Sequence, residues 1–385
     1  MAKWNYVKIG DVCTVERGGS PRPIDKFITD DPNGINWIKI GDTTDSMYIT
    51  ETAQKIIPEG MKKSRYVQPG DFLLSNSMSF GRPYILKIDG CIHDGWLVLR
   101  DNGGVFDKRF LYYYLSSPST YQKFKNMAVG GVVNNLNSDM VRGVTVPVPK
   151  MEEQMEIVQT LDNVSNLIFL RKQQLAKLDE LVKARFIELF GDYDLTHPQE
   201  SWVTIKEIGT VVGGATPKTD HDEYWGGSHR WITPAELDAD SGYIYDSVRK
   251  LTKAGVESCS LQEMPVGTVF LSSRAPIGKV AIAGNTFYCN QGFKNIICKE
   301  DITPRYLYTV LLLNVEYLNS LGRGATFKEI SKGIVENIRI PVPAMELQKQ
   351  FAAFVEQTDK SKVAVQKALD EAQLLLDSLM QKYFG

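Results

Sequence analysis

Three glycine-containing loops in each half of the chain gather side chains that could bind nucleic acid. They span residues 18–22, 75–82 and 130–137, and residues 213–218, 272–279 and 322–328. The candidate contact residues are Ser20, Arg22, Asn76, Ser77, Ser79, Arg82, Asn134 and Asn135, then Thr216, Lys218, Ser273, Arg274, Lys279, Arg323, Thr326 and Lys328. Such groups bond phosphate oxygens and base edges, and glycine permits close approach. The alternative is that these are ordinary solvated loops.

Sequence motifs for catalysis are missing from the chain. It has no glycine-rich turn opening a cofactor-binding helix, no Walker A loop and no Asn/Asp-Pro-Pro-aromatic step. The five cysteines form no Cys-x-x-Cys pair, and the stretch from His221 to His229 matches no metal-ligand spacing, which favours a polar loop. We therefore expect no catalytic residue, no cofactor and no metal site in this chain.

The charge balance limits how the chain could hold a polyanion. The net charge is −2, with 24 Lys/Arg against 22 Asp/Glu in residues 1–191 and 20 against 24 in the rest. A face that binds nucleic acid must therefore be local, and partner proteins would supply further phosphate contacts. No apolar run approaches the roughly 18 residues of a membrane span, and the N-terminus lacks a signal peptide's apolar core, so we expect a cytoplasmic protein.

The elements that position these loops occur twice. Val146-Pro147-Val148-Pro149 matches Ile340-Pro341-Val342-Pro343, 194 residues later (146 to 340). Gly70, Gly81 and Gly95 match Gly267, Gly278 and Gly292, and Ser20-Pro21-Arg22 matches Thr216-Pro217-Lys218. Each repeat begins with about 150 residues of short β-type runs such as 71–75 and 268–272, with a helical stretch at 109–115 or 305–313.

A long helix is predicted after each Pro-x-Pro step. Residues 152–190 and 346–384 contain no Gly or Pro. A heptad row runs through Leu161, Ile168, Leu175, Val182 and Leu189, and a row alternating by four and three through Val365, Leu369, Ala372, Leu376, Leu379 and Tyr383. Each helix of about 38 residues would be roughly 57 Å long. We expect antiparallel pairing with a pseudo-two-fold axis; packing of each helix on its own domain is the alternative.

These features together resemble the specificity subunit of type I restriction–modification systems, over essentially the whole chain. The resemblance rests on the duplication, the Val-Pro-Val-Pro step, Glu153-Gln154 with Leu347-Gln348, and the long helices. Leu271-Ser272-Ser273-Arg274-Ala275-Pro276-Ile277-Gly278 and Cys289-Asn290-Gln291-Gly292-Phe293 also look like recurrent strings of that family's target-recognition domains. Domain one departs from them at residues 74–81 and 92–96, as domains that read different half-sites would.

The resemblance implies an α+β fold in which two mixed α/β target-recognition domains (1–147 and 192–341) are separated by two spacer helices (148–191 and 342–385). The helices pair as an antiparallel coiled coil. It also implies that each domain reads half of a bipartite site in double-stranded DNA. The helices would set the gap and dock two modification subunits that use S-adenosylmethionine. Restriction subunits that use ATP and magnesium would bind that complex.

Two other readings remain open from the sequence. The chain could be the specificity subunit of a related bipartite-site system in which one partner polypeptide both modifies and cleaves DNA. It could also be an interaction scaffold that uses its coiled coil for partners and binds no DNA.

Overall fold

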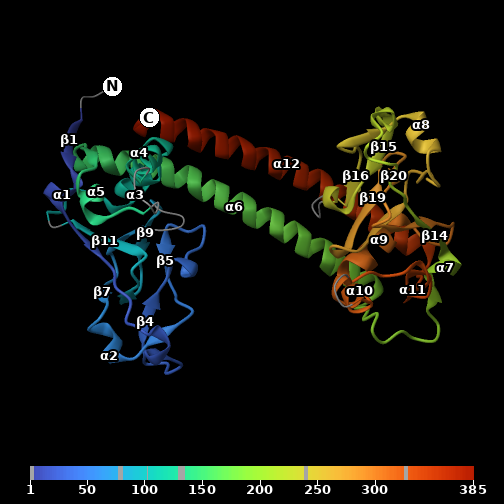
Figure 1. Ribbon diagram of the computed structural model, residues 1–385, viewed down its shortest axis with the longest axis horizontal. Coiled ribbons are helices and arrows are strands. Elements are labelled where there is room, and N and C mark those ends of the chain that lie inside the picture. Colours follow the sequence, from blue (N-terminus) through green and yellow to red (C-terminus); the bar gives the residue numbers. More distant parts are fainter. Residues whose placement is uncertain (1–3, 77–80, 102, 129–134, 238–241, 325–327) are drawn as a thin grey trace. The chain divides into compact units, whose positions relative to one another are not determined.

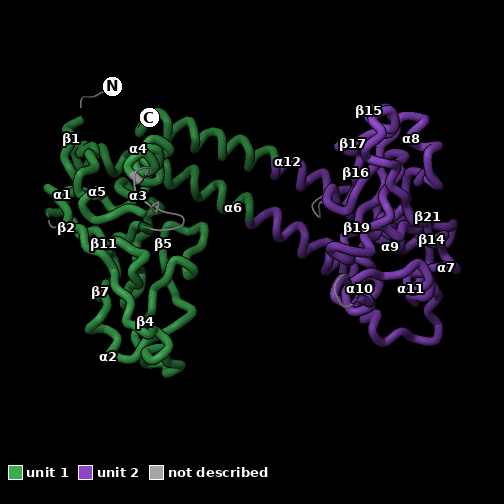
Figure 2. Tube along the Cα trace, viewed as in Figure 1, with its two compact units in different colours: residues 1–172, 367–385 green, residues 173–366 purple. Residues whose placement is uncertain are grey.

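The chain folds into two compact units in a computed structural model that describes residues 4–76, 81–101, 103–128, 135–237, 242–324 and 328–385. Unit 1 comprises residues 1–172 and 367–385, and unit 2 comprises residues 173–366 (Figure 2). Both units mix strands and helices (Figure 1), which confirms the predicted α+β class.

The described residues of unit 1 form three sheets, with strand orders β1-β12, β2-β11-β8-β9-β5 and β3-β6-β4-β10-β7. Its strands are β1 (Asn5–Lys8), β2 (Cys13–Arg17), β3 (Ile28–Thr29), β4 (Ile35–Ile38), β5 (Tyr48–Ile49), β6 (Lys55–Ile56), β7 (Arg65–Val67), β8 (Phe72–Ser75), β9 (Pro83–Leu86), β10 (Gly90–Ile92), β11 (Trp96–Asp101) and β12 (Thr145–Val148). Its shorter helices are α1 (Ile9–Val12), α2 (Pro58–Met61), α3 (Lys108–Ser116), α4 (Pro118–Ala128) and α5 (Ser138–Arg142).

In the part of unit 2 that the structure describes, the strands also form three sheets, with strand orders β13-β22, β14-β21-β18-β19-β16 and β17-β15-β20. Its strands are β13 (Val203–Thr204), β14 (Gly209–Gly213), β15 (Trp225–Ile232), β16 (Tyr243–Ile244), β17 (Arg249–Leu251), β18 (Val269–Ser273), β19 (Ile277–Ala283), β20 (Tyr288–Cys289), β21 (Lys294–Cys298) and β22 (Arg339–Ile340). Its shorter helices are α7 (Ile205–Ile208), α8 (Lys253–Glu257), α9 (Pro304–Leu313), α10 (Val315–Ser320) and α11 (Lys332–Glu336).

The pairing of the central strands repeats between the units. Strand β10 pairs in parallel with β4, and β20 pairs in parallel with β15. The central strands β8 and β18 are each flanked on both sides by antiparallel neighbours, β11 and β9 in unit 1 and β21 and β19 in unit 2. The duplication read from the glycine spacing is therefore a duplication of topology.

The central strands β8 and β18 are apolar up to their final serines because both faces of the sheet that contains them are covered. In β8, Phe72 and Leu74 pack in the core that includes α3, whereas Leu73 packs in the core that includes the second sheet. In β18, Leu271 packs in the core that includes α9, whereas Phe270 packs in the core that includes the second sheet. A strand buried on both faces loses the polar alternation of a one-sided sheet, which explains the continuous apolar runs in the sequence.

The two long helices are α6 (Met151–Phe190) and α12 (Met345–Phe384), each 40 residues long. A buried glutamine in the first turn joins each helix to its domain. Gln154 accepts a hydrogen bond from the Asp107 backbone N–H and donates to the carbonyls of Val105 and Pro149, at 2.9–3.0 Å. Gln348 makes the equivalent three bonds to Thr303, Asp301 and Pro343, at 2.8–3.1 Å.

The long helices pair within each unit. In unit 1, Val164 and Ile168 of α6 pack against Ala372 of α12, with Leu369, Leu376 and Leu379 beside them. In unit 2, Phe186 and Phe190 of α6 lie edge-on to Phe351 of α12, with ring centroids 5.4 and 5.6 Å apart, and Lys362 pairs with Asp179. The chain directions in these contacts are opposite, so the predicted antiparallel pairing of the seam residues is confirmed.

Candidate nucleic-acid interface

A tight turn at the end of β10 joins the first two predicted loops of unit 1. The Gly18 N–H donates to the Trp96 carbonyl at 2.9 Å, and the Gly19 N–H donates to the Ile92 carbonyl at 3.1 Å. From the other side, the Asn76 N–H donates to the Gly95 carbonyl at 2.9 Å. A Cβ on Gly18 would lie 2.1 Å from the His93 carbonyl oxygen, so the close approach requires glycine there. The turn at residues 93–96 is the point where the loops meet.

The turn after β20 does the same in unit 2. The Ala215 N–H donates to the Cys289 carbonyl at 3.0 Å, and the Ser273 N–H donates to the Gly292 carbonyl at 2.7 Å. Gly214 stands where Gly18 stands in unit 1, and its Cβ would lie 2.1 Å from the Cys289 carbonyl oxygen. The backbone framework of the two candidate sites is therefore the same.

The third loop ends against the second in both units. The Leu136 N–H donates to the Asn76 carbonyl, and the Ile330 N–H donates to the Ser273 carbonyl, each at 3.0 Å. In unit 2, Arg323 and Glu329 also exchange both backbone hydrogen bonds, at 3.1 and 3.0 Å. The described ends of segments that are far apart in the sequence thus meet in each unit.

A serine closes the second loop in each unit. The Ser75 hydroxyl accepts from the Arg82 N–H at 2.9 Å, and the Ser272 hydroxyl accepts from the Lys279 N–H at 2.8 Å. At the loop tip in unit 2, Ala275 has a φ of 47°, a left-handed conformation that non-glycine residues rarely adopt. Such strain is concentrated at functional positions.

The predicted contact residues differ in their exposure. Arg22, Arg82, Thr216, Lys218, Arg323 and Lys328 are exposed, and Ser20, Asn135, Arg274 and Lys279 are half-buried. Asn76 and Ser273 are buried, with exposed fractions of 1% and 0%. Ser77, Ser79, Asn134 and Thr326 lie outside the described residues.

The two buried side chains, Asn76 and Ser273, make hydrogen bonds to neighbouring segments of the site. The Asn76 side-chain amide donates to the Asp94 carbonyl at 2.9 Å. The Ser273 hydroxyl accepts from Lys294 Nζ at 3.3 Å, and that same ammonium pairs with Glu329 at 3.1 Å. In this conformation both side chains position the surface and neither reaches a ligand.

Sequence reasoning missed the residue at the tip of each turn. The Ser20 hydroxyl donates to Asp94 Oδ1 at 2.7 Å, and the Thr216 hydroxyl donates to Gln291 Oε1 at 2.6 Å. Asp94 and Gln291 stand 197 residues apart (94 to 291), the same offset that separates Gly95 from Gly292. That shared offset is the signal that could have revealed the pair.

The turn in unit 1 carries an ionised carboxylate beside a neutral imidazole. The hydrogen bond from Ser20 lowers the pKa of Asp94, and the backbone N–H of Asp94 and the nearby Arg17 lower it further against partial burial. Burial lowers the pKa of His93, opposed by the charges of Asp94 and Asp42. Near neutral pH the tip therefore presents an acceptor with a formal negative charge.

Cations border this acceptor. Arg22, whose side chain is 83% exposed, lies 3.5 Å from Asp94 Oδ2, and Arg17 donates to the Asp94 carbonyl at 3.0 Å. Arg17 was also not among the predicted residues. Exposed guanidinium groups around a partly exposed acceptor suit a ligand with an anionic backbone and hydrogen-bonding bases.

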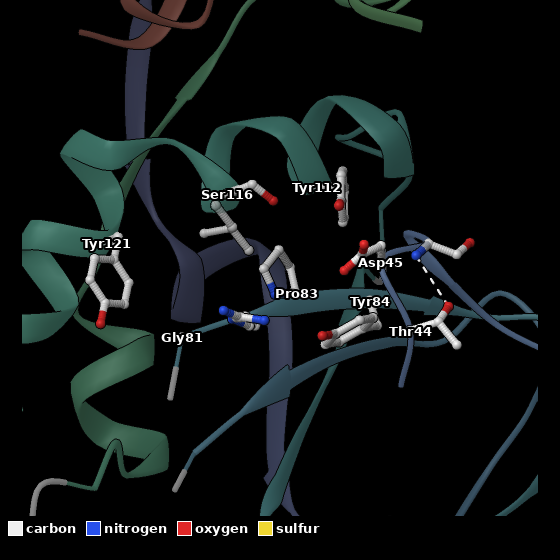
Figure 3. Close-up of a pocket in the computed structure, with 11 residues that line it drawn as sticks. Thr44, Asp45, Gly81, Pro83, Tyr84, Tyr112, Ser116 and Tyr121 are labelled. Carbon is white, nitrogen blue, oxygen red and sulfur yellow. Dashed lines mark hydrogen bonds between the residues drawn. The ribbon is translucent and has the colours of Figure 1, made fainter. Parts of the chain in front are cut away.

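A cavity of about 540 Å³ opens beside the second loop of unit 1. Tyr112 from α3 and Tyr84 from β9 line it together with Tyr121 from α4, and Figure 3 shows Asp45 between the first two in that view. Arg82 also lines the cavity. The cavity therefore adjoins the end of the second loop at Gly81 and Arg82.

Two further searches of the described ranges gave negative results. In residues 4–76, 81–101, 103–128, 135–237, 242–324 and 328–385, no cluster of three or more His, Cys, Asp or Glu side chains could hold a metal ion. No helix in that part of the chain is long and apolar enough to cross a membrane.

Comparison with known proteins identifies the family. A family model described as the type I restriction modification DNA specificity domain matches residues 1–180 and 200–373. The chain belongs to this family. It is a DNA-binding specificity subunit, the non-catalytic part of a type I restriction–modification complex.

Individual relatives agree with this family. The chain is 25% identical to the putative type I restriction enzyme MjaX specificity subunit of Methanocaldococcus jannaschii, over 97% of this chain and 92% of that protein. A shorter match, 42% identical over 185 residues, is to the MjaIX specificity subunit of the same organism and covers 46% of this chain and 43% of that protein.

Solved structures share the fold. One chain, from work on complex assembly and conformational transition of the type I system, is similar with a TM-score of 0.63 and 19% identity, over 100% of this chain and 98% of that one. The S subunit from M. genitalium is similar with a TM-score of 0.57 and 15% identity, over 100% and 96%.

Proposed function

We propose that each unit of this specificity subunit reads one half of a bipartite duplex site through the surface around its turn, residues 93–96 in unit 1 and 290–293 in unit 2. The observation that carries this proposal is the repetition of one backbone framework with different side chains. Asp94 in one unit corresponds to Gln291 in the other, and Arg22 corresponds to Lys218. Two readers of the same build with different polar groups suit two half-sites with different bases.

The exposed cations divide into two roles in this proposal. Arg22, Arg82, Lys218, Arg323 and Lys328 are exposed and would neutralise phosphates, which fixes the position of the duplex. Arg274 is half-buried beside the strained tip at residue 275, so it would be held in one orientation and read a base edge. Ser20, Asn135, Thr216 and Lys279 complete the surface.

The long helices would fix the gap between the half-sites and dock two modification subunits. Forty residues at about 1.5 Å each give roughly 60 Å. Exposed Phe169 and Leu170 on α6 and Leu374 on α12 are apolar groups that such subunits could cover. Restriction subunits would join that complex. S-adenosylmethionine, ATP and magnesium would act in these partners, in the cytoplasm where the DNA lies.

Alanine at Arg274 tests the assignment of a base reader. In the complex with a modification subunit, Arg274→Ala should weaken specific binding by about 1–3 kcal/mol and relax one position of a half-site. Binding to unrelated duplex DNA should change far less. Lys299→Ala serves as the control, because it removes a charge of the same sign just after β21, where Lys299 donates to the carbonyls of Lys206 and Glu207.

The salt dependence distinguishes the two kinds of contact. If Arg274 touches only phosphate, all sequences should bind more weakly and the slope of log affinity against log salt should fall by about one. Specific affinity and salt slope both equal to those of the Lys299 control would contradict a DNA contact by the second loop of unit 2.

A further inference from the structure

The tip of each turn is built to hold one side chain outward. After β10, the His93 ring accepts the Gly95 N–H at 2.6 Å, and after β20 the Asn290 amide oxygen accepts the Gly292 N–H at 2.9 Å. The bond closes the turn around the intervening residue, Asp94 in unit 1. Histidine in unit 1 and asparagine in unit 2 therefore make the same hydrogen bond across the turn. The residue at the tip of the turn differs in chemistry between the units.

Each tip side chain receives a short hydrogen bond from a hydroxyl of the first loop. The hydroxyls of Ser20 and Thr216 donate to one oxygen of Asp94 and Gln291, at 2.7 and 2.6 Å. The Asp94 side chain remains 43% exposed, and its second oxygen accepts only a long hydrogen bond, 3.5 Å, from the exposed Arg22 among the described residues. Gln291 is exposed, and among the described residues no hydrogen bond uses its Nε2. Both tips thus keep hydrogen-bonding capacity for a ligand in a preset orientation.

The remaining capacity differs in a way that bases can distinguish. A carboxylate only accepts, so Asp94 can take the exocyclic amino group of cytosine and would repel the O6 and N7 acceptors of guanine. The amide of Gln291 can donate through Nε2 and accept through the second lone pair of Oε1, which matches N7 and the N6 amino group of adenine. The hydrogen bond from the Ser20 or Thr216 hydroxyl leaves each tip side chain able to bond a base in this way.

We propose that Asp94 and Gln291 are specificity-determining residues, with Asp94 reading a cytosine amino group in one half-site and Gln291 reading adenine in the other. Ser20 and Thr216 are their positioning residues. This inference rests on the proposed function, since it requires that each unit reads a half-site. It adds the base that each turn selects.

The test is methylation mapping of genomic DNA in cells that carry the chain with its modification subunit. Asp94→Asn keeps the shape but adds a donor, so one cytosine-specific position in one half-site should relax or change. Gln291→Glu removes the donor to N7 and should relax one adenine position in the other half-site. Asp139→Asn and Gln262→Glu are matched controls at exposed positions of the same units, and both half-sites should stay unchanged.

Binding of the complex to duplexes that carry every single-base-pair change in the mapped site gives the magnitude. Discrimination at the affected position should fall by roughly 5- to 150-fold in each tip variant, with the other half-site unaltered. Ser20→Ala leaves the Asp94 carboxylate in place but frees its orientation. It should reduce discrimination at the same base pair, whereas a general folding defect would weaken binding to every duplex equally.

The outcomes separate the two proposals. An unchanged motif with normal methylation in both tip variants would overturn the assignment of Asp94 and Gln291 and leave the proposed function standing. Loss of discrimination at several positions in both half-sites would also overturn it, because each tip lies in one unit. Absence of a bipartite motif with the unmodified chain and its partner would instead refute the proposed function itself.

Discussion

Replacing Gln154 by leucine should destabilise unit 1 strongly. Gln154 is fully buried at the start of α6. Its side-chain amide bonds the Asp107 N–H and the carbonyls of Val105 and Pro149. Leucine has a similar volume and removes all three bonds. The buried backbone groups then lose their partners while the apolar packing is largely kept.

The magnitude follows from the number of bonds. At about 1 kcal/mol per hydrogen bond, the loss is about 3 kcal/mol, and more if the backbone groups stay unsolvated. For a unit of this size that corresponds to a fall of roughly 6–12 °C in the midpoint of its thermal transition. Gln348→Leu should act in the same way on unit 2, where Gln348 makes the equivalent three bonds.

Calorimetry of the full chain measures both transitions. Gln159→Leu is the matched control, because Gln159 is exposed on the same helix and its replacement should change stability by less than about 0.5 kcal/mol. The reasoning would be refuted if Gln154→Leu shifted the transition no further than Gln159→Leu. The long helix would then be joined to its domain by something other than this amide.

Three other perturbations have defined outcomes. His93→Asn gives the turn of unit 1 the residue type found at the equivalent position in the turn of unit 2. Burial lowers the pKa of His93 below its usual 6.5, so the unfolded chain binds the proton more readily and the wild type should lose stability as the pH falls through that value. Urea midpoints at acidic and neutral pH should show a smaller loss in the variant; an equal loss would contradict this. Gly214→Ala places a Cβ 2.1 Å from the Cys289 carbonyl oxygen and should lower the free energy of unfolding, measured by urea titration, by about 1–3 kcal/mol. The control Gly333→Ala should be tolerated, because its Cβ would have nothing within 4 Å. Equal urea midpoints for the two variants would argue against the close approach at Gly214. Four helix-forming residues inserted after Gln174 lengthen α6 by about 6 Å and rotate its far end by roughly 40°. Methylation mapping should then show a gap between the half-sites that is longer by one or two base pairs. An unchanged gap in an active variant would mean that the helices do not set this gap.

Much of the fold could be predicted because its signals are local or repeated. The seam of α12, with Val365 and Ala372 buried, follows from spacing alone. The repeat was visible in glycines such as Gly81 and Gly278, which both have positive φ, at 79° and 91°. Glycine is retained where no other residue fits, so such positions survive when the surrounding side chains diverge.

The candidate site was harder to predict because its contacts join distant segments. Asn76 lies in a polar, glycine-rich stretch that reads as an exposed loop, yet it is buried because it donates to the carbonyl of Asp94. Asp94 itself gains its role from Ser20, 74 residues away. Neither composition nor periodicity encodes which loop reaches which turn.

Lysine and glutamate in unit 2 illustrate the same limit. Lys294 stands at the start of β21, in a run that predicts a strand, and its ammonium reaches both Ser273 and Glu329. The sequence places these three residues in separate segments. Only the pairing of β21 with β18, and of the third loop with the second, brings them together.

Exchange of one domain tests the central claim most directly. Residues 1–147, predicted as target-recognition domain 1, would be replaced by the corresponding segment of another specificity subunit, with residues 148–191, 192–341 and 342–385 kept. The chimera would be expressed with its modification subunit and the methylated motif mapped across the genome. The account predicts that one half-site changes to that of the donor while the other half-site and the gap stay the same. A chimera that methylates DNA with both half-sites altered, or with neither altered, would contradict independent reading by the two units.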